Sequence, residues 1–400
     1  MDEPPLKKQR RGPSGAVWLG VFFIIAMAAG ALARLPQAAG TRVAGAIKVS
    51  YRSTGVRLLG SLKLSSDRAP VFSNDETVAL FGLSGGRAPI QAVKVSSLGA
   101  FTGATPLYEA GTAAAPPAAL GMPNGLVWLS PDGFFYRQAD GAVSKIAAPP
   151  TGTGTPRIVT GSWGSATERL SPPPQGSTSW GSSTLTWYNW SAQQLATITL
   201  QGTVVTSLAA AGSSGKGAAV AAGTMVVREG DPSFGLAFFP VPGKLGWEYS
   251  AGKAPLRYLT FNGEGDLLAA ASGQEVAEFN PLGERLWLVR VSGAAGLIFS
   301  GRNDAIVLTD RGELAAFDRR GKRVWTRTLS GQPILLAPVP GGNLLVATSA
   351  GVIGMRADGA SSWVATPDAA IKRVALSPSG TRIAVVTVDD KLLLYETVSR

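Results

Sequence analysis

The chain has 400 residues, of which 45% are hydrophobic and 16% charged, with 50 glycines, 27 prolines, no cysteine and no histidine. This composition predicts a folded, turn-rich chain of short β-strands, because a helical bundle would carry more charge on its exposed faces. It excludes disulfides, cysteine nucleophiles, cysteine or histidine metal sites and histidine acid–base catalysis. The formal net charge of +11 would suit an anionic partner, but only residues 7–11 form a basic cluster, so nucleic-acid binding is not favoured.

The N-terminal region contains an uncharged apolar run over residues 15–33, preceded by a basic tail over residues 1–14. A helix of this length just spans the hydrocarbon core of a bilayer, which is about 30 Å thick. A signal peptide is the alternative, because Ala31-Leu32-Ala33 fits a cleavage site, but the run exceeds the usual apolar region of about 7–15 residues. We expect a single-pass helix in the inner or plasma membrane.

Basic residues lie on both sides of this apolar run, so the orientation of the predicted helix depends on the compact cluster before it. The cluster favours a cytoplasmic tail and an extracytoplasmic domain. We therefore expect a linker over residues 34–56 and a folded domain over residues 57–400. Cleavage of the apolar segment would instead give a secreted protein.

The second half of the chain repeats itself with a period near forty residues. Four tryptophans are separated by 40, 38 and 38 residues, and a glycine stands four residues before each: Gly243 and Trp247, Gly283 and Trp287, Gly321 and Trp325, Gly359 and Trp363. Each unit contains short apolar runs separated by turn-forming residues, as in 297–329. Such a period predicts the blades of a β-propeller, in which the tryptophan opens the outermost strand.

Weaker versions of the same pattern extend toward the N-terminus. We expect outermost strands near residues 58, 100, 145, 195, 247, 287, 325 and 363, which gives an all-β, eight-bladed propeller. Seven blades are the alternative if residues 97–123 form only a loop. The final unit lacks an outermost strand, whereas residues 58–64 form an unaccompanied one, so pairing of the two ends is expected to close the ring.

The segment "AFDRRGKRVW" resembles the tryptophan-docking repeat of pyrroloquinoline-quinone-type propellers, and the last unit resembles a WD40-type repeat without its G-H and W-D pairs. The resemblance implies that the repeated tryptophans pack between adjacent blades. The quinone-dependent dehydrogenases of that family use a disulfide between adjacent cysteines and a calcium ion. Because this chain lacks cysteine and a matching calcium cluster, the resemblance implies the non-enzymatic branch, with no cofactor or metal. That branch includes a propeller lipoprotein of outer-membrane protein assembly.

The residues outside the repeat offer few candidate sites. Trp163 and Trp180 lie in a Gly/Ser/Pro-rich zone and could bind a protein or a sugar, or could fill the cores of divergent blades. Trp187 and Trp190 are expected in the core. The segment 262–266 could hold calcium but fits a β-turn better, and 212–217 fits a flexible loop better than a phosphate-binding loop.

Together these features predict a non-enzymatic protein-binding scaffold in or beside a membrane complex. One alternative is a module that binds a glycan or another envelope polymer. The other is a calcium-dependent, carboxylate-based hydrolase or lyase in the propeller channel. Expected innermost strands such as "RYLTFN" and "LIFSG" carry no acidic residue, which argues against this enzyme.

Overall fold

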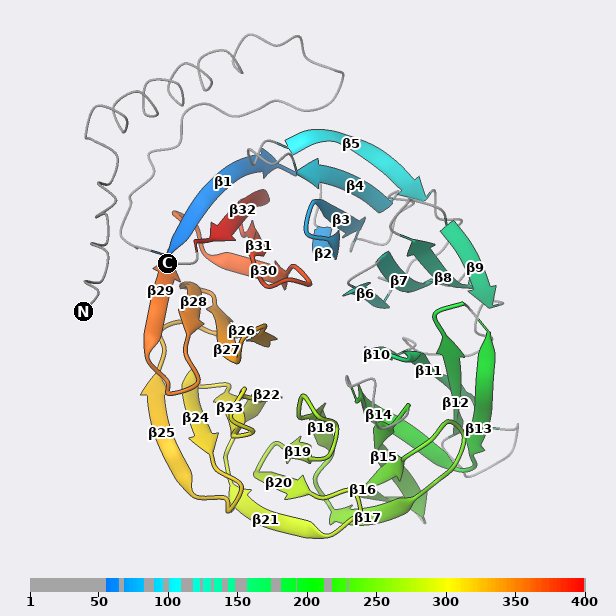
Figure 1. Ribbon diagram of the computed structural model, residues 1–400. Helices are drawn as coiled ribbons and strands as arrows, with labels where there is room; N and C mark the ends of the chain where they lie inside the picture. Colours follow the sequence, from blue (N-terminus) through cyan, green and yellow to red (C-terminus); the bar gives the residue numbers. More distant parts are fainter. Residues whose placement is uncertain are drawn as a thin grey trace, which may run out of the picture. The chain divides into compact units, whose positions relative to one another are not determined.

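The computed structural model describes residues 55–64, 68–82, 90–95, 101–108, 118–122, 125–130, 133–138, 143–147, 157–173, 181–191, 193–211, 218–228 and 230–398. Among these residues the strands form eight four-stranded antiparallel sheets, which stand around a central opening (Figure 1). The predicted all-β propeller is confirmed. We number the sheets as blades 1 to 8.

In the first half of the ring, each blade is built from four consecutive strands. Their bounds are β2 (Arg68–Asn74), β3 (Thr77–Gly82), β4 (Ile90–Val95) and β5 (Phe101–Tyr108) in blade 1; β6 (Ala118–Met122), β7 (Gly125–Ser130), β8 (Gly133–Gln138) and β9 (Val143–Ala147) in blade 2; β10 (Arg157–Gly161), β11 (Gly164–Ser171), β12 (Ser182–Asn189) and β13 (Gln194–Leu200) in blade 3; β14 (Thr203–Ala210), β15 (Val220–Arg228), β16 (Asp231–Phe239) and β17 (Trp247–Gly252) in blade 4.

The second half follows the same plan until the last blade, which takes its outermost strand from the start of the ring. The bounds are β18 (Leu256–Phe261), β19 (Leu268–Ser272), β20 (Glu275–Phe279) and β21 (Arg285–Arg290) in blade 5; β22 (Ala294–Phe299), β23 (Ala305–Thr309), β24 (Glu313–Phe317) and β25 (Arg323–Thr328) in blade 6; β26 (Pro333–Val339), β27 (Asn343–Thr348), β28 (Gly351–Met355) and β29 (Ser361–Ala365) in blade 7; β30 (Ile371–Leu376), β31 (Arg382–Thr387), β32 (Lys391–Thr397) and β1 (Val56–Lys63) in blade 8.

The ring closes between its two ends, as predicted. β1 pairs antiparallel with β32, from Val56 opposite Thr397 to Lys63 opposite Lys391. Residues 97–123, which could have been a loop, contain the outermost strand of blade 1 and the innermost strand of blade 2. Among the described residues no helix is long and apolar enough to cross a membrane. The predicted helix at 15–33 and the rest of the segment 1–54 lie outside the described residues.

The core lies between the blades. Ala271 and Val276 of blade 5, for example, form one buried cluster with Leu297 and Val307 of blade 6. All five residues of β19 and of β23 are buried. Inner strands are covered on both faces by neighbouring blades, which explains why their sequences are nearly continuous apolar runs without alternation.

The two faces of the ring carry different connections. Within each blade, the first strand joins the second on one face, and in blades 1 to 7 the third joins the fourth on the same face, because alternate strands are antiparallel. Val56 pairs with Thr397, whose backbone N–H donates to the carbonyl of Thr381 in the turn between β30 and β31. The chain therefore joins the ring on this face, which we call the N-terminal face. The opposite face carries the connections from second to third strands and between blades.

Candidate partner-binding surface

Each repeated tryptophan packs against a glycine of the following blade. A β-carbon added to Gly283 would lie 2.8 Å from the ring of Trp247, and one added to Gly359 would lie 2.7 Å from the ring of Trp325. The other pairs are Trp287 with Gly321 and Trp363 with Gly55. The glycine four residues before a tryptophan thus contacts the tryptophan of the preceding blade rather than its own.

Gly243, at the start of the series, differs from the other repeat glycines. It faces the β-carbon of Ala196 in blade 3, because blade 3 has no tryptophan at the equivalent place. Among the described residues, Trp247 donates its indole N–H to the carbonyl of Pro281 at 3.1 Å, and Trp325 donates to that of Ala357 at 3.0 Å. These bonds join each tryptophan to the turn that holds the next glycine.

Trp287 differs from Trp247 and Trp325 in its indole contacts, and an acidic residue lies beside it. Its Nε1 is buried without a hydrogen-bond partner in the described part of the chain, as are both carboxyl oxygens of Glu278. Glu278 lies opposite Trp287 in the register of β20 and β21, whereas Ala316 lies opposite Trp325 in blade 6. Burial raises the pKa of the Glu278 carboxyl to about 7, although its interaction with the Trp287 indole acts in the other direction.

The tryptophans outside the repeat occupy different environments. Trp187 is fully buried and makes an edge contact with Phe239 at 5.5 Å between ring centroids. Trp163 is partly buried, packs on the cluster that contains Trp187, and donates to the carbonyl of Ala211 in blade 4 at 3.3 Å. Trp190 donates to the carbonyl of Ser162 at 2.9 Å. These contacts fit the packing role for Trp163; its binding role stays a prediction. Trp180 lies outside the described residues.

The candidate calcium segment at 262–266 is a turn. Oδ1 of Asn262 accepts hydrogen bonds from the backbone N–H groups of Asp266 and Leu267, at 3.0 and 3.1 Å. Among the described residues no group of three or more acidic side chains could hold a metal ion. The segment 212–217 lies outside the described residues.

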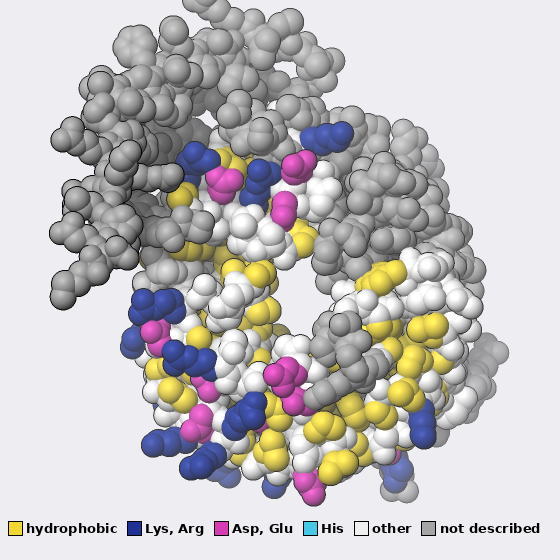
Figure 2. Space-filling view, in the orientation of Figure 1, with side chains coloured by type: hydrophobic (Ala, Val, Ile, Leu, Met, Phe, Trp, Pro, Cys, Tyr) yellow, Lys and Arg dark blue, Asp and Glu magenta, His cyan; other side chains and the backbone are white. Residues whose placement is uncertain are grey.

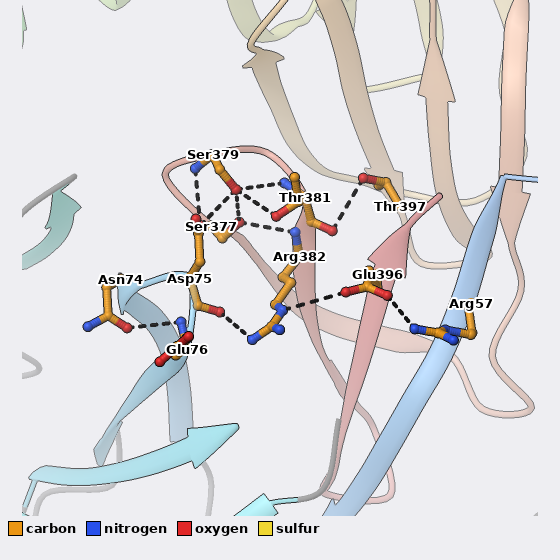
Figure 3. A network of polar contacts seen from close by, with 10 residues as sticks. All are labelled: Arg57, Asn74, Asp75, Glu76, Ser377, Ser379, Thr381, Arg382, Glu396 and Thr397. Atoms are coloured by element: carbon orange, nitrogen blue, oxygen red, sulfur yellow. Dashed lines mark hydrogen bonds and ion pairs between the residues drawn. The ribbon is translucent and has the colours of Figure 1, made fainter. Parts of the chain in front are cut away.

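A polar network on the N-terminal face ties the closing blade to blade 1 (Figure 3). Oδ1 of Asp75, in the turn between β2 and β3, accepts hydrogen bonds from the backbone N–H and the hydroxyl of Ser379, at 3.2 and 2.8 Å. Arg382 donates to the carbonyl of Asp75 at 2.8 Å. Glu396 lies 4.0 Å from Arg382 and 2.5 Å from Arg57. The network therefore joins β1, β32 and the first blade at the seam where the ring closes.

Exposed apolar side chains gather on the outer part of blades 4 and 5. Val241 and Leu245, in the turn between β16 and β17, are 44% and 40% exposed, and Leu282, in the turn between β20 and β21, is 79% exposed. Leu286 and Leu288 follow on the outermost strand β21. We call these five residues the rim patch. Hydrophobic side chains gather over β14–β18 in Figure 2, whereas Lys and Arg gather over β24–β29.

Trp247 links the turn that carries Leu282 to blade 4. The turn that carries Leu282 also holds Pro281, which accepts the bond from Trp247, and Gly283, which lies against its ring. Leu288 lines a shallow groove between blades 4 and 5 together with Tyr249. The patch therefore crosses the seam between two blades on the N-terminal face and the rim.

Sequence reasoning missed the rim patch, although a signal for it was present. Leu282 stands directly before the repeat glycine, where the equivalent turns of blades 6 and 7 carry Arg320 and Asp358. A large apolar residue in a turn that is otherwise charged marks the departure from the repeat. Only the structure shows that this side chain is uncovered.

The ring of four-stranded blades defines this chain as a β-propeller. The sequence profile of the family described as "Outer membrane protein assembly factor BamB" matches residues 169–333 and 310–399, which together span more than half of the 400 residues. The chain belongs to this family. A search of curated proteins finds no sequence match.

Solved structures give the same fold. The chain is similar to the Dos1 propeller, with 11% identity, a TM-score of 0.61, and coverage of 85% of this chain and 95% of that one. It is similar to Sqt1 of Saccharomyces cerevisiae, with 12% identity, a TM-score of 0.61, and coverage of 85% and 98%. It also matches BamB of Moraxella catarrhalis, with 14% identity, a TM-score of 0.49, and coverage of 85% and 99%. At these identities the first two establish the propeller fold alone.

Proposed function

We propose that this chain is a non-enzymatic scaffold, anchored in the inner or plasma membrane through residues 15–33, whose extracytoplasmic propeller binds a protein partner through the rim patch. The observation that carries the proposal is the cluster of exposed apolar side chains across blades 4 and 5, with Leu282 at 79% exposure. Exposed apolar side chains that gather on the surface of a folded domain are typical of protein interfaces. The family description, which names an outer-membrane protein assembly factor, supports a role in a membrane-associated complex.

Site-specific crosslinking tests the partner proposal. A photo-reactive amino acid at Leu282, in the full chain in native membranes, should capture one predominant protein. The matched control is the same group at Val388, which is 58% exposed in a turn of blade 8 on the opposite face. Leu282→Asp should abolish co-purification of the captured protein, whereas Val388→Asp should leave it unchanged.

Two outcomes would contradict this proposal. If Leu282 and Val388 captured the same proteins in equal yield, the rim patch would have no selectivity. If Leu282→Asp left the complex intact, the apolar surface would not be the docking site.

The membrane anchor is tested separately. A mature protein that begins at Arg34 and stays in solution without detergent would rule out the membrane helix.

A further inference from the structure

A buried carboxyl group lies at the base of the turn that carries Leu282 of the rim patch. Glu278, near the end of β20, is fully buried, and neither of its carboxyl oxygens has a hydrogen-bond partner among the described residues. Trp287, opposite it in β21, packs in the seam between blades 5 and 6, and its Nε1 is likewise buried and unsatisfied in that part of the chain. Buried polar groups without partners cost free energy, so stability does not explain Glu278.

Glu278 is also a departure from the repeat. The residue opposite the repeat tryptophan is Phe238 in blade 4, Ala316 in blade 6 and Gly354 in blade 7. Among these four blades, blade 5 alone places an ionisable group there. An alanine fits an almost identical strand in blade 6, where β24 reads ELAAF and β20 reads EVAEF. The architecture of the blade therefore does not require a carboxyl group at this place.

The groups that act on Glu278 come from blades 5 and 6. On its own sheet it faces Trp287, and the charges of Arg319, Asp304 and Asp318 reach it from the turns of blade 6. Burial raises the pKa of its carboxyl to about 7; the two aspartates act in the same direction, and the indole and Arg319 act against it. Arg319 is exposed, and no ion pair to it occurs among the described residues. An ionised Glu278 would gain a partner by turning out of the seam toward this guanidinium.

The position of Glu278 couples its ionisation to the rim patch. The pairing of β20 with β21 is irregular at Glu278, and Leu286 is the extra residue of this β-bulge. Leu282 stands four residues after Glu278, in the turn of the same hairpin. Across the seam, Trp287 packs against Gly321 in a turn of blade 6. A movement of Glu278 out of the seam would therefore displace both leucines of the rim patch.

We propose that Glu278 is a proton-dependent switch for the rim patch: the protonated carboxyl stays in the seam and keeps the patch competent to bind, whereas the ionised carboxyl leaves the seam and weakens binding. This inference rests on the proposed function, because it concerns regulation of the same surface. The sign follows from burial, since a site without partners tolerates the neutral form better than the charged one. Partner binding should therefore be strong at acidic pH and fall as pH rises through about 7.

Crosslinking from Leu282 at two pH values tests the switch in the full chain in native membranes. The yield of the captured protein should fall about fivefold or more between pH 6 and pH 8, as the protonated fraction of Glu278 falls. Glu278→Gln should keep the two yields within about twofold of each other, because the amide cannot ionise. The matched control Glu275→Gln, on the same strand, should retain the fall. The photo-reactive group at Val388 is the reference for any effect of pH on the crosslinking chemistry.

Hydrogen exchange of the purified full chain in a non-ionic detergent tests the seam without a partner. After correction for the intrinsic pH dependence of exchange, segments 280–290 and 317–324 should lose protection between pH 6 and pH 8, whereas segment 356–365 of blade 7 should not. Glu278→Gln should abolish this loss. Glu278→Ala, which gives blade 5 the residue that blade 6 carries, is a second variant and should act in the same way.

Two results would overturn the proposal. One is an equal loss of protection in the unmodified chain and in both Glu278 variants. The other is capture from Leu282 that does not depend on pH, or that depends on it equally in Glu278→Gln. If protection changed as expected but Leu282 captured no protein at either pH, the proposed function would fail while the proton-dependent seam would be upheld. Failure of the switch and failure of the rim patch can therefore be told apart.

Discussion

Trp325 of blade 6 lies against Gly359 of blade 7, at a position where no larger residue fits. A β-carbon on Gly359 would lie 2.7 Å from the indole ring, and the backbone there has a φ of +80°. The repeat glycine therefore has two separate reasons to be glycine, a left-handed backbone and a close approach. The two reasons can be separated experimentally, because Gly341 has the left-handed backbone but no close neighbour.

Gly359→Ala should destabilise the propeller more than Gly341→Ala. Gly341 has a φ of +83°, but nothing lies within 4 Å of its β-carbon position. Both changes place alanine in a left-handed conformation, at a cost of about 1–2 kcal/mol. Gly359→Ala must also displace Trp325, which adds about 1–3 kcal/mol. Denaturant unfolding of the two variants measures the difference, and equal losses would show that the tryptophan contact contributes nothing.

Glu278 should make the stability of the propeller fall as pH rises toward 8. Burial raises its folded pKa to about 7, whereas its unfolded value is near 4.5, so the folded state binds more protons between these values. Folding is therefore favoured at low pH, and on the order of 3 kcal/mol is lost as pH rises from about 4.5 through about 7. Unfolding by denaturant at pH 5 and pH 8 measures this change.

The control for Glu278 lies on the same strand. Glu278→Gln should remove most of the pH dependence, because the amide cannot ionise, whereas Glu275→Gln should retain it. A Glu278→Gln protein with the same loss of stability between pH 5 and pH 8 as the unmodified chain would assign the pH dependence to other groups.

Ending the chain at Asp390 should open the ring. This truncation removes β32, which lies between β31 and β1, and leaves both of those strands with an unpaired edge. We expect the loss of a single cooperative unfolding transition, or a fall in the melting temperature on the order of 10 °C or more. Removal of residues 399–400 alone is the control and should leave melting unchanged. Equal melting of both truncations would contradict closure through β32.

Trp163 can be assigned to packing or to binding with two substitutions. Trp163→Ala should cost about 2–4 kcal/mol, because it removes contacts with a buried cluster and the bond to the carbonyl of Ala211. Trp163→Phe should cost about 1–2 kcal/mol and leave co-purification of the partner intact. If Trp163→Phe folded normally and lost the partner, Trp163 would be a binding residue, as one reading of the sequence suggested.

The sequence alone determined the propeller and much of its layout. The spacing of Trp247, Trp287 and Trp325 placed outermost strands, and a described strand lies at or next to each predicted position. Closure between the last unit and residues 58–64 followed from counting strands, because an open sheet edge is unfavourable. These features are local or periodic, so they can be recognised from the order of residues alone.

Only the tertiary structure decided which residues meet across blades and which remain uncovered. Gly321 stands four residues before Trp325 in the sequence, but in the ring it lies against Trp287, because its turn packs on the blade before it. Glu278 and Leu282 lie four residues apart, yet one is fully buried and the other is 79% exposed. Burial depends on which neighbouring sheet covers a side chain, and that relation between distant segments is fixed only when the ring closes.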